Sequence, residues 1–568
     1  MAFTISPGVS VSEINLTTVV PSILTTAGAF VGAFNWGPAN KRIQISSETQ
    51  LVSNFSQPDS NTYISYFTAA SFLAYGNNLK VVRAVGANGK NASSNTNTTQ
   101  VTNEDQFEYG YLNNLTNGNT YGPFIARYSG AIGNSLAISV VDSASYSNTW
   151  NINGVGVSSY VSGAPSTSIS GAAAGSSNDQ IHVVVMDTTG LISGVKNSVL
   201  EVFQFLSKAS DGLDALGNSN YYKNYIFRNS KYIYAIDPIS YSTTSTSWGV
   251  PMANRSFATL SSPQTVSLSG GADDQPTDAN LVSAWNYFAN GDEVDVSLLL
   301  AGGVSTIVQQ TVMNIATSRK DCVAFISPPS SSVVNQNGNE TTNITTWVNS
   351  LGTTSSYVVA DSGWKYMFDK YNNTYRWIPL NGDIAGLCVY TDSVRDPWFS
   401  PAGYNRGNLK NVVKLAWNPT KAQRDILYPL GVNPVTTFPG QGTVLFGDKT
   451  FLNQPSAFDR INVRRLFISL EKTIATASKL SLFEFNDDFT RNQFVALVTP
   501  YLRDIQGRRG ITDFRVVCDT TNNTPQVIDS NQFVGDIYIK PARSINFIQL
   551  NFVAVRTGVS FSEVVGQF

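Results

Sequence analysis

Few residues of this chain carry the side chains that catalysis usually requires. The chain has a single histidine, His182, at the start of the apolar run IHVVVMD. A lone histidine in such a place is expected to end a buried strand rather than to bind a ligand. One histidine rules out an HExxH zinc site and argues against a Ser-His-Asp triad.

Phosphate and calcium chemistry have equally little support. No GxxxxGK[ST] loop is present, and Gly89-Lys90 lacks both the earlier glycine and the following hydroxyl residue. The acidic segment GGADDQPTD lacks the alternating acids and distal glutamate of a calcium loop, so a turn and a helix cap near Thr277 are expected instead. Asp487 and Asp488 are expected in a solvated loop. We therefore predict no catalytic residues, no metal site, no cofactor and no enzymatic activity.

The charge balance argues against a nucleic-acid partner. The 568 residues include 37 Lys+Arg and 39 Asp+Glu, for a net charge of −2. Nucleic-acid binding needs clustered excess positive charge, which this balance does not supply. A net charge near zero also removes one barrier to self-association. The length predicts two to four domains.

The cysteines and the terminal sequence indicate the compartment. Cys322, Cys388 and Cys518 lie far apart without a CxxC pair, so buried free thiols are expected, as in a reducing cytosol. The start, MAFTISPGVSVSE, shows no signal peptide. Apolar windows such as VDVSLLLAGGVSTIV are too short and interrupted to cross a bilayer, so no membrane insertion is predicted.

The first part of the chain has an α/β pattern over residues 27–90. AGAFVGAF and LKVVRAV predict buried strands, and YISYFTAASFLAYG predicts a helix that ends at Gly76. From residue 91 the sequence KNASSNTNTTQ becomes polar and repetitive, which is typical of a surface loop or short insertion.

The middle part predicts further strands and crossovers. IHVVVMD predicts a strand, VLEVFQFLSKA a helix, and DANLVSAWNYFAN a helix that follows the cap near Thr277. VDVSLLLAGG and CVAFISPP are continuous apolar runs, typical of strands buried in a parallel sheet. VSTIVQQTVMNIATSRKD between them predicts the crossover helix.

The C-terminal part contains the most periodic helix of the chain, over residues 460–480. Apolar residues recur every three or four positions and form one face. They are Val463, Leu466, Leu470, Ile474, Ala477 and Leu480. A second helix is predicted over 493–505, bent or restarted at Pro500. INFIQLNFVAV, near the end, predicts a long strand.

Short motifs in a fixed order run along most of the chain. They are PGV at 7–9 with Glu13, YSGAIGNS at 128–135, LSGG at 268–271 with Asp274, IAG at 384–386 with Asp392, PW at 397–398, PAG at 401–403, LY at 427–428, GVNP at 431–434, Gly447 with Thr450, and VRRL at 463–466. Together they resemble the contractile tail sheath proteins of bacteriophages. Phe446 stands where the family often has tryptophan, and residues 91–120 are short for the protruding domain of the largest sheaths.

The resemblance implies an α/β and α+β multidomain fold with a discontinuous core. The expected parts are an N-terminal arm and linker (1–20), a core (21–90 plus 391–555), inserted outer domains rich in β-structure (91–390, with 91–120 a short surface insertion) and a C-terminal arm (556–568). It also implies a virion protein, assembled in the bacterial cytoplasm. Its subunits form stacked hexameric rings around an inner tail tube, with baseplate and tail terminator proteins as further partners.

Two short alternating segments lie at the chain ends. Neither has a nearby turn that would pair it locally. In the resembling family, terminal strands join a sheet of a neighbouring subunit, which is strand addition at a sheet edge. The predicted arm contacts are Val9, Val11, Glu13, Ile14, Val559, Phe561 and Val564. Ordinary frayed or intramolecular terminal strands are the alternative.

Basic residues repeat every seven positions on the predicted helix 460–480. Arg465, Lys472 and Lys479, with Arg464 beside them, are predicted to grip an acidic tube surface by charge complementarity. A solvated helix face or an intramolecular ion pair is the alternative.

The predicted function is that of a sheath subunit which drives the tube through the host envelope with stored conformational energy. The sheath of a non-viral contractile injection system is an alternative that uses the same mechanics. A β-rich surface adhesin is an alternative of a different class, but it should carry a signal peptide.

Overall fold

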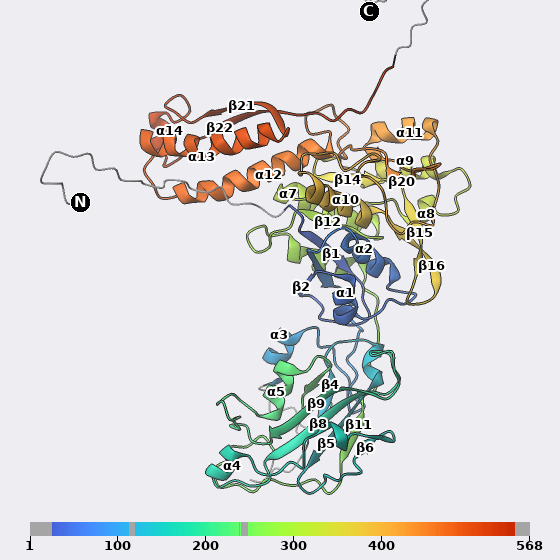
Figure 1. Ribbon diagram of the computed structural model, residues 1–568, viewed down its shortest axis with the longest axis vertical. Helices are drawn as coiled ribbons and strands as arrows, with labels where there is room; N and C mark the ends of the chain where they lie inside the picture. Colours follow the sequence, from blue (N-terminus) through green and yellow to red (C-terminus); the bar gives the residue numbers. More distant parts are fainter. Residues whose placement is uncertain (1–24, 113–119, 238, 240–247, 551–568) are drawn as a thin grey trace, which may run out of the picture. The chain divides into compact units, whose positions relative to one another are not determined.

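The computed structural model describes residues 25–112, 120–237, 239 and 248–550. The described residues belong to two compact units. We call residues 21–397 with 401–477 the core unit, and residues 478–568 with 398–400 the C-terminal unit. Figure 1 shows the ribbon coloured along the sequence.

The core unit is built around a seven-stranded sheet that is parallel except for one edge strand. Its six parallel strands are short and almost wholly buried, as continuous apolar runs predict, and the edge strand is partly exposed. In spatial order they are β18 (Val432–Asn433), β14 (Val358–Asp361), β13 (Val323–Ile326), β12 (Leu298–Leu300), β1 (Gly28–Gly32), β3 (Leu79–Arg83) and the antiparallel β2 (Arg42–Ile45). The predicted pair of parallel strands around a crossover helix is confirmed as β12, α7 (Thr306–Arg319) and β13.

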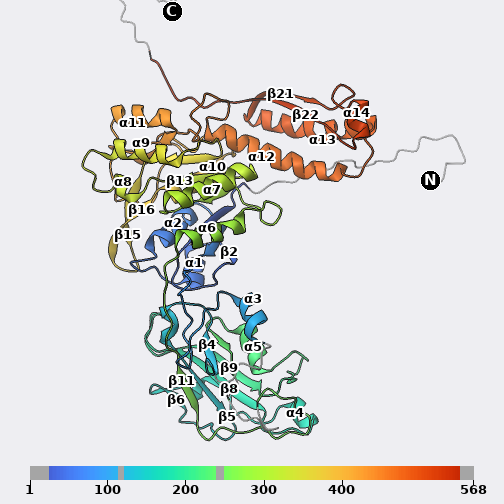
Figure 2. The ribbon, with the colours of Figure 1, turned by 180° about the vertical axis from the view of Figure 1, so that it is seen from behind.

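Helices cover both faces of this sheet, as Figures 1 and 2 show from opposite sides. One face packs against α1 (Glu48–Phe55), α2 (Tyr63–Leu73) and α10 (Asn381–Val394). The other packs against α6 (Asp278–Trp285), α7 and α9 (Glu340–Leu351). The predicted cap of α6 is confirmed, because Thr277 and Asn280 form a reciprocal capping box.

A β-rich region is inserted between β3 and α6. Its main sheet is antiparallel, in the order β11 (Gln264–Ser267), β5 (Leu136–Asp142), β8 (Gln180–Asp187) and β9 (Ser198–Ser207). The smaller elements are α3 (Glu104–Phe107), β4 (Phe124–Ala126), β6 (Asn151–Ile152), β7 (Val155–Gly156), α4 (Ile169–Ala173), α5 (Tyr222–Asn229) and β10 (Ile233–Ala235). The helix predicted at VLEVFQFLSKA is wrong, because these residues form β9 along β8.

The two ends of this insertion lie side by side at the core. Lys90 and Ala272 exchange backbone hydrogen bonds of 2.9 and 3.0 Å. The buried guanidinium of Arg83, at the end of β3, donates to the carbonyls of Phe34, Gly37 and Ser129. Burial lowers the pKa of Arg83 to about 10. Arg83 therefore bonds the core and the insertion at once.

The discontinuous core is confirmed, but its predicted boundaries need correction. Residues 298–361 contribute β12, β13 and β14 to the sheet that contains β1 and β3, so the chain is back in the core well before the predicted boundary at 390. At the other end, residues 478–550 pack with the C-terminal unit instead of the core predicted for 391–555. The sequence patterns predicted these strands but not which strands they pair with.

The rest of the core unit consists of two small antiparallel sheets and short helices. They are α8 (Ser330–Val333), β15 (Trp364–Asp369), β16 (Thr374–Pro379), β17 (Lys414–Leu415), α11 (Lys421–Leu427), β19 (Val435–Phe438) and β20 (Gly442–Leu445). The predicted periodic helix is confirmed as α12 (Ile461–Ser478). The three cysteines are free and buried, as predicted.

The C-terminal unit consists of a long helix, a short helix and a two-stranded sheet. They are α13 (Asp488–Gly507), α14 (Pro525–Asp529), β21 (Ile511–Val517) and β22 (Asp536–Pro541). α13 is longer than predicted and continues through Pro500. The strand predicted from Ile545 is not formed up to Leu550, where the description ends. No helix in the described ranges has the length and apolarity to cross a membrane.

Candidate assembly site

Helix α12 carries the predicted basic residues, and its apolar face fixes their directions. Val463, Leu466, Leu470 and Ala477 are all buried, as the period predicts. Leu480 lies beyond the helix and is 67% exposed, so it does not extend this face. Because the helix packs closely at its N-terminal half, polar residues there must find partners inside the protein.

Arg465 is one of these enclosed residues. Its guanidinium donates to both carboxylate oxygens of Asp392 on α10, at 2.9 and 2.6 Å, and both side chains are almost completely buried. Thr25 donates a further hydrogen bond of 2.7 Å to the same carboxylate. A bidentate, fully buried pair of this kind joins α12 to α10.

Arg464 is also enclosed. It donates to the side-chain oxygens of Tyr357 and Ser356, and its guanidinium lies 3.9 Å from the ring centroid of Phe458. Arg464 and Arg465 are 5% and 4% exposed, so their charges are directed to partners inside the protein. The sequence did not show which residues cover them.

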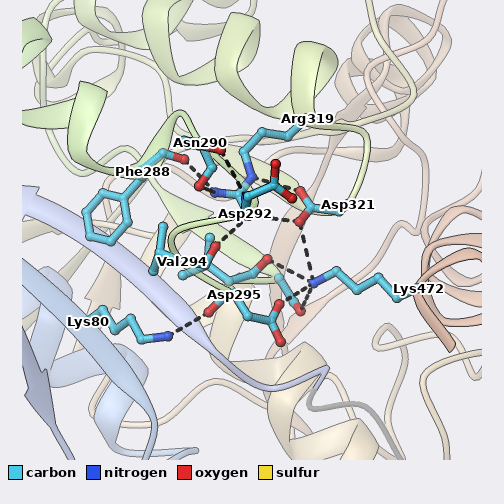
Figure 3. Close-up of polar contacts among 11 residues, drawn as sticks. Lys80, Phe288, Asn290, Asp292, Val294, Asp295, Arg319, Asp321 and Lys472 are labelled. Atoms are coloured by element: carbon cyan, nitrogen blue, oxygen red, sulfur yellow. Dashed lines mark hydrogen bonds and ion pairs between the residues drawn. The ribbon is translucent and has the colours of Figure 1, made fainter. Parts of the chain in front are cut away.

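Lys472 ends in a polar cluster beside strand β12, shown in Figure 3. Its Nζ donates to Asp295 Oδ1 at 2.7 Å and to the Val296 carbonyl and Ser297 Oγ, each at 3.1 Å. Asp321 lies 3.8 Å from the same nitrogen. Lys472 thus forms an intramolecular ion pair, which is one of the two alternatives to a tube contact given above.

The cluster connects three further segments through Arg319 and Lys80. Arg319 donates to both oxygens of Asp321 at 2.8 Å and to the Phe288 carbonyl at 2.6 Å. Burial alone would raise the pKa of Asp321, but the Arg319 guanidinium and Lys472 hold it below its usual value. Lys80 on β3 donates to the Asp295 carbonyl at 2.6 Å. The arrangement fastens α12 to the sheet and offers no reacting group.

Lys479, the last predicted basic residue, lies in the C-terminal unit. It begins a 3₁₀ turn, Lys479–Ser481, and its side chain is exposed. The structure therefore leaves Lys479 as the exposed one among the four predicted tube contacts.

The C-terminal unit contains a sheet of only two strands, β21 and β22. β21 pairs with β22 from Val517 and Asp536 to Ile511 and Pro541, and within the described residues neither strand has another neighbour. Helix α13 packs against β21. A lone pair of strands is marginally stable, and its unpaired edges can accept further strands.

The predicted arm contacts fall outside the described residues. These are Val9, Val11, Glu13, Ile14, Val559, Phe561 and Val564. Their pairing therefore stays a prediction.

A buried polar cluster that sequence reasoning missed lies at the carboxyl end of the core sheet. Lys365 Nζ is 2.8 Å from Asp383, and both side chains are 1% exposed. Asp361, the last residue of β14, accepts hydrogen bonds from Ser327 Oγ at 2.7 Å and Gly363 N at 2.9 Å. Burial raises the pKa of Asp361 to about 8 and also raises that of Asp383. No sequence spacing joins these residues.

Asn381 lies beside this cluster at the end of the sheet. It donates to the Gly302 carbonyl and to Ser327 Oγ, and it accepts from Gly302 N. Among the described residues, no group of three or more His, Cys, Asp or Glu side chains could hold a metal ion.

Comparison with known proteins gives the class of this chain. Residues 276–451 match the phage tail sheath protein central domain, and residues 453–554 match the phage tail sheath C-terminal domain. The chain belongs to the phage tail sheath family, the structural subunits of contractile phage tails.

Individual relatives span the whole chain. The tail sheath protein of Vibrio phage KVP40 is 34% identical over 99% of this chain and 100% of the relative. That of Enterobacteria phage T4 is 33% identical over 99% of both chains. The crystal structure of a sheath tail protein from Listeria innocua shares the fold, with a TM-score of 0.52 and 12% identity over 92% of this chain and 96% of that one.

Proposed function

We propose that this chain polymerises as stacked hexameric rings around an inner tail tube. Contraction of the polymer then drives the tube through the host envelope. Full-length similarity to tail sheath proteins at 31–34% identity carries this proposal. Those relatives are phage proteins, which favours a phage tail over a non-viral injection system and gives no support to an adhesin. Work comes from conformational energy stored during assembly in the bacterial cytoplasm, and baseplate and tail terminator proteins close the two ends.

The open edges of the β21–β22 sheet support the route of assembly. Arms from neighbouring subunits add to these edges, with Val9, Val11 and Ile14 from the N-terminal arm and Val559, Phe561 and Val564 from the C-terminal arm. Ordering an arm costs about 1–2 kcal/mol per residue, and backbone pairing returns only about 0.5–1.5 kcal/mol per hydrogen bond. Burial of the apolar side chains, about 1.5–3 kcal/mol each, makes the addition favourable.

Contact with the tube is assigned to Lys479. It is the exposed member of the basic set, whereas Lys472, Arg464 and Arg465 have partners in the core unit. An exposed charge gives a weak contact that can break during contraction.

Negative-stain microscopy of the purified, concentrated chain tests polymerisation directly. The expected result is tubes or stacks of rings, and uniform monomers under all conditions would overturn the proposal. The double substitution V9S/V11S should give a folded monomer that no longer polymerises. S10A/S12A alters the alternate face of the same arm and is the matched control. Equal polymerisation of the two variants would refute the role of the N-terminal arm.

A further inference from the structure

An exposed apolar segment of the C-terminal unit runs from beyond the end of α12 into the first turn of α13. We call residues 480–489 the apolar loop. Five of its large side chains are 63% to 104% exposed. They are Leu480, Leu482, Phe483, Phe485 and Phe489.

The size of this loop surface indicates an interface. Each aromatic side chain presents roughly 150–250 Å². Three exposed phenylalanines and two exposed leucines within ten residues therefore concentrate several hundred Å² of apolar surface in one short segment, and exposed apolar surface of this extent marks interaction sites. Phe483 is fully exposed and has a left-handed φ of 70°, which is uncommon for a bulky residue.

A second exposed apolar segment follows β22 in the same unit. We call residues 545–550 the apolar tail. Its large side chains, Ile545, Phe547, Ile548 and Leu550, are 71% to 84% exposed. Because both surfaces are exposed in one chain, the loop and the tail are not packed on each other within that chain.

The charges beside the two surfaces are complementary. The apolar loop carries Glu484 and Asp487, and hydrogen bonds from Thr490 keep the pKa of Asp487 below its usual value. The apolar tail follows the exposed Arg543, whereas Lys540 before it is already paired with Asp513 at 2.9 Å. A partner for the loop should present apolar side chains beside positive charge, and the tail has this composition.

We propose that the apolar loop of one subunit binds the apolar tail of a second copy of this chain. Each chain carries one loop and one tail, so the contact is head-to-tail and generates an open array instead of a closed dimer. This inference rests on the proposed function. It identifies the surface of a neighbouring subunit that the segment before the C-terminal arm contacts. It makes the loop a subunit contact and leaves the tube to Lys479.

Disulfide cross-linking in mixed polymers tests the contact. One full-length chain carries F483C, and a second carries I545C, F547C or I548C in turn. The three native cysteines are buried. Y109C is the matched control for F483C, because Tyr109 is 98% exposed in the inserted region. Microscopy of each mixture shows first whether polymer has formed.

The expected result is a disulfide-linked dimer that requires both variants in one polymer. Its yield should exceed that of the Y109C mixtures by roughly tenfold, because docking raises the local concentration of one thiol near the other. Polymer without any cross-link above the control would overturn this inference and leave the proposed function standing. An intrachain disulfide alone in the double variant F483C/I548C would also overturn it. Absence of polymer from the wild-type chain would instead refute the proposed function.

Discussion

Replacing Asp361 by asparagine tests whether burial keeps this carboxyl group protonated in the folded protein. The Asp361 side chain is enclosed at the end of β14 and receives hydrogen bonds only from Ser327 and Gly363 among the described residues. Burial is the main cause that raises its pKa from 3.8 to about 8, and the nearby Asp383 adds to it. Lys365 is the cation of the cluster and pairs with Asp383.

The sign of the pH effect follows from this raised pKa. Between about pH 4 and pH 8, folded Asp361 holds a proton that the unfolded chain has lost. The free energy of unfolding should therefore fall as pH rises through this window, by at most about 1.4 kcal/mol per pH unit. Asparagine is nearly isosteric and neutral throughout, so D361N should lack this component.

Urea unfolding of dilute full-length chain, followed by circular dichroism at several pH values, measures the difference. The stability of wild type relative to D361N should decline steadily from pH 5 to pH 8. D504N is the control, because Asp504 forms an exposed pair with Arg508, and it should leave the pH profile unchanged. Parallel profiles for wild type and D361N would show that Asp361 is ionised when folded, and the reasoning from burial would fail.

Four further substitutions probe the core, helix α12 and the lysine that follows this helix. R465M should lower the free energy of unfolding by about 3–5 kcal/mol, because it leaves the buried Asp392 carboxylate without its charge partner; a thermal or urea transition unchanged from wild type would contradict this. K472M should lower it by roughly 1–2 kcal/mol through lost hydrogen bonds, whereas K479E should leave it unchanged and impair only sheath growth on purified tubes; equal effects of K479E on growth with and without tubes would disprove the tube contact. G382A should lower the free energy of unfolding by about 1–3 kcal/mol, because its added Cβ would lie 2.5 Å from the Thr68 carbonyl oxygen. At Gly440 an added Cβ would contact no atom, but the backbone φ is positive. G440A in the same urea assay therefore shows how much backbone strain alone contributes.

Local patterns predicted elements whose residues decide their own conformation. The apolar runs at β12 and β13, the period of α12 and the cap at Thr277 are such cases, and all three are confirmed. The helix predicted at residues 198–207 was wrong because the apolar positions there fit a helix as well as a strand. The neighbouring strand β8 decided between the two, and the β-branched and aromatic residues of β9 pack against it.

The sequence patterns did not predict which elements far apart in the chain lie next to each other. Strand β1 pairs with β12, about 270 residues away, so the predicted insertion extended too far. The partners of the basic residues on α12 are also far away in the sequence, because Arg465 meets Asp392, 73 residues away, and Lys472 meets Asp295, 177 residues away. Periodicity placed these cations on a helix, but only tertiary packing determines whether a cation faces solvent or a carboxylate.

The adjacent ends of the inserted region make it a natural cassette. Lys90 and Ala272 already form hydrogen bonds with each other. A foreign domain or a short turn inserted between them should therefore disturb the core sheet little. Arg83 sets the condition for such grafts, since removal of Ser129 takes away one of its three carbonyl acceptors. A replacement that restores an acceptor there should be tolerated, and one that does not would leave the buried guanidinium with only the Phe34 and Gly37 carbonyls as acceptors.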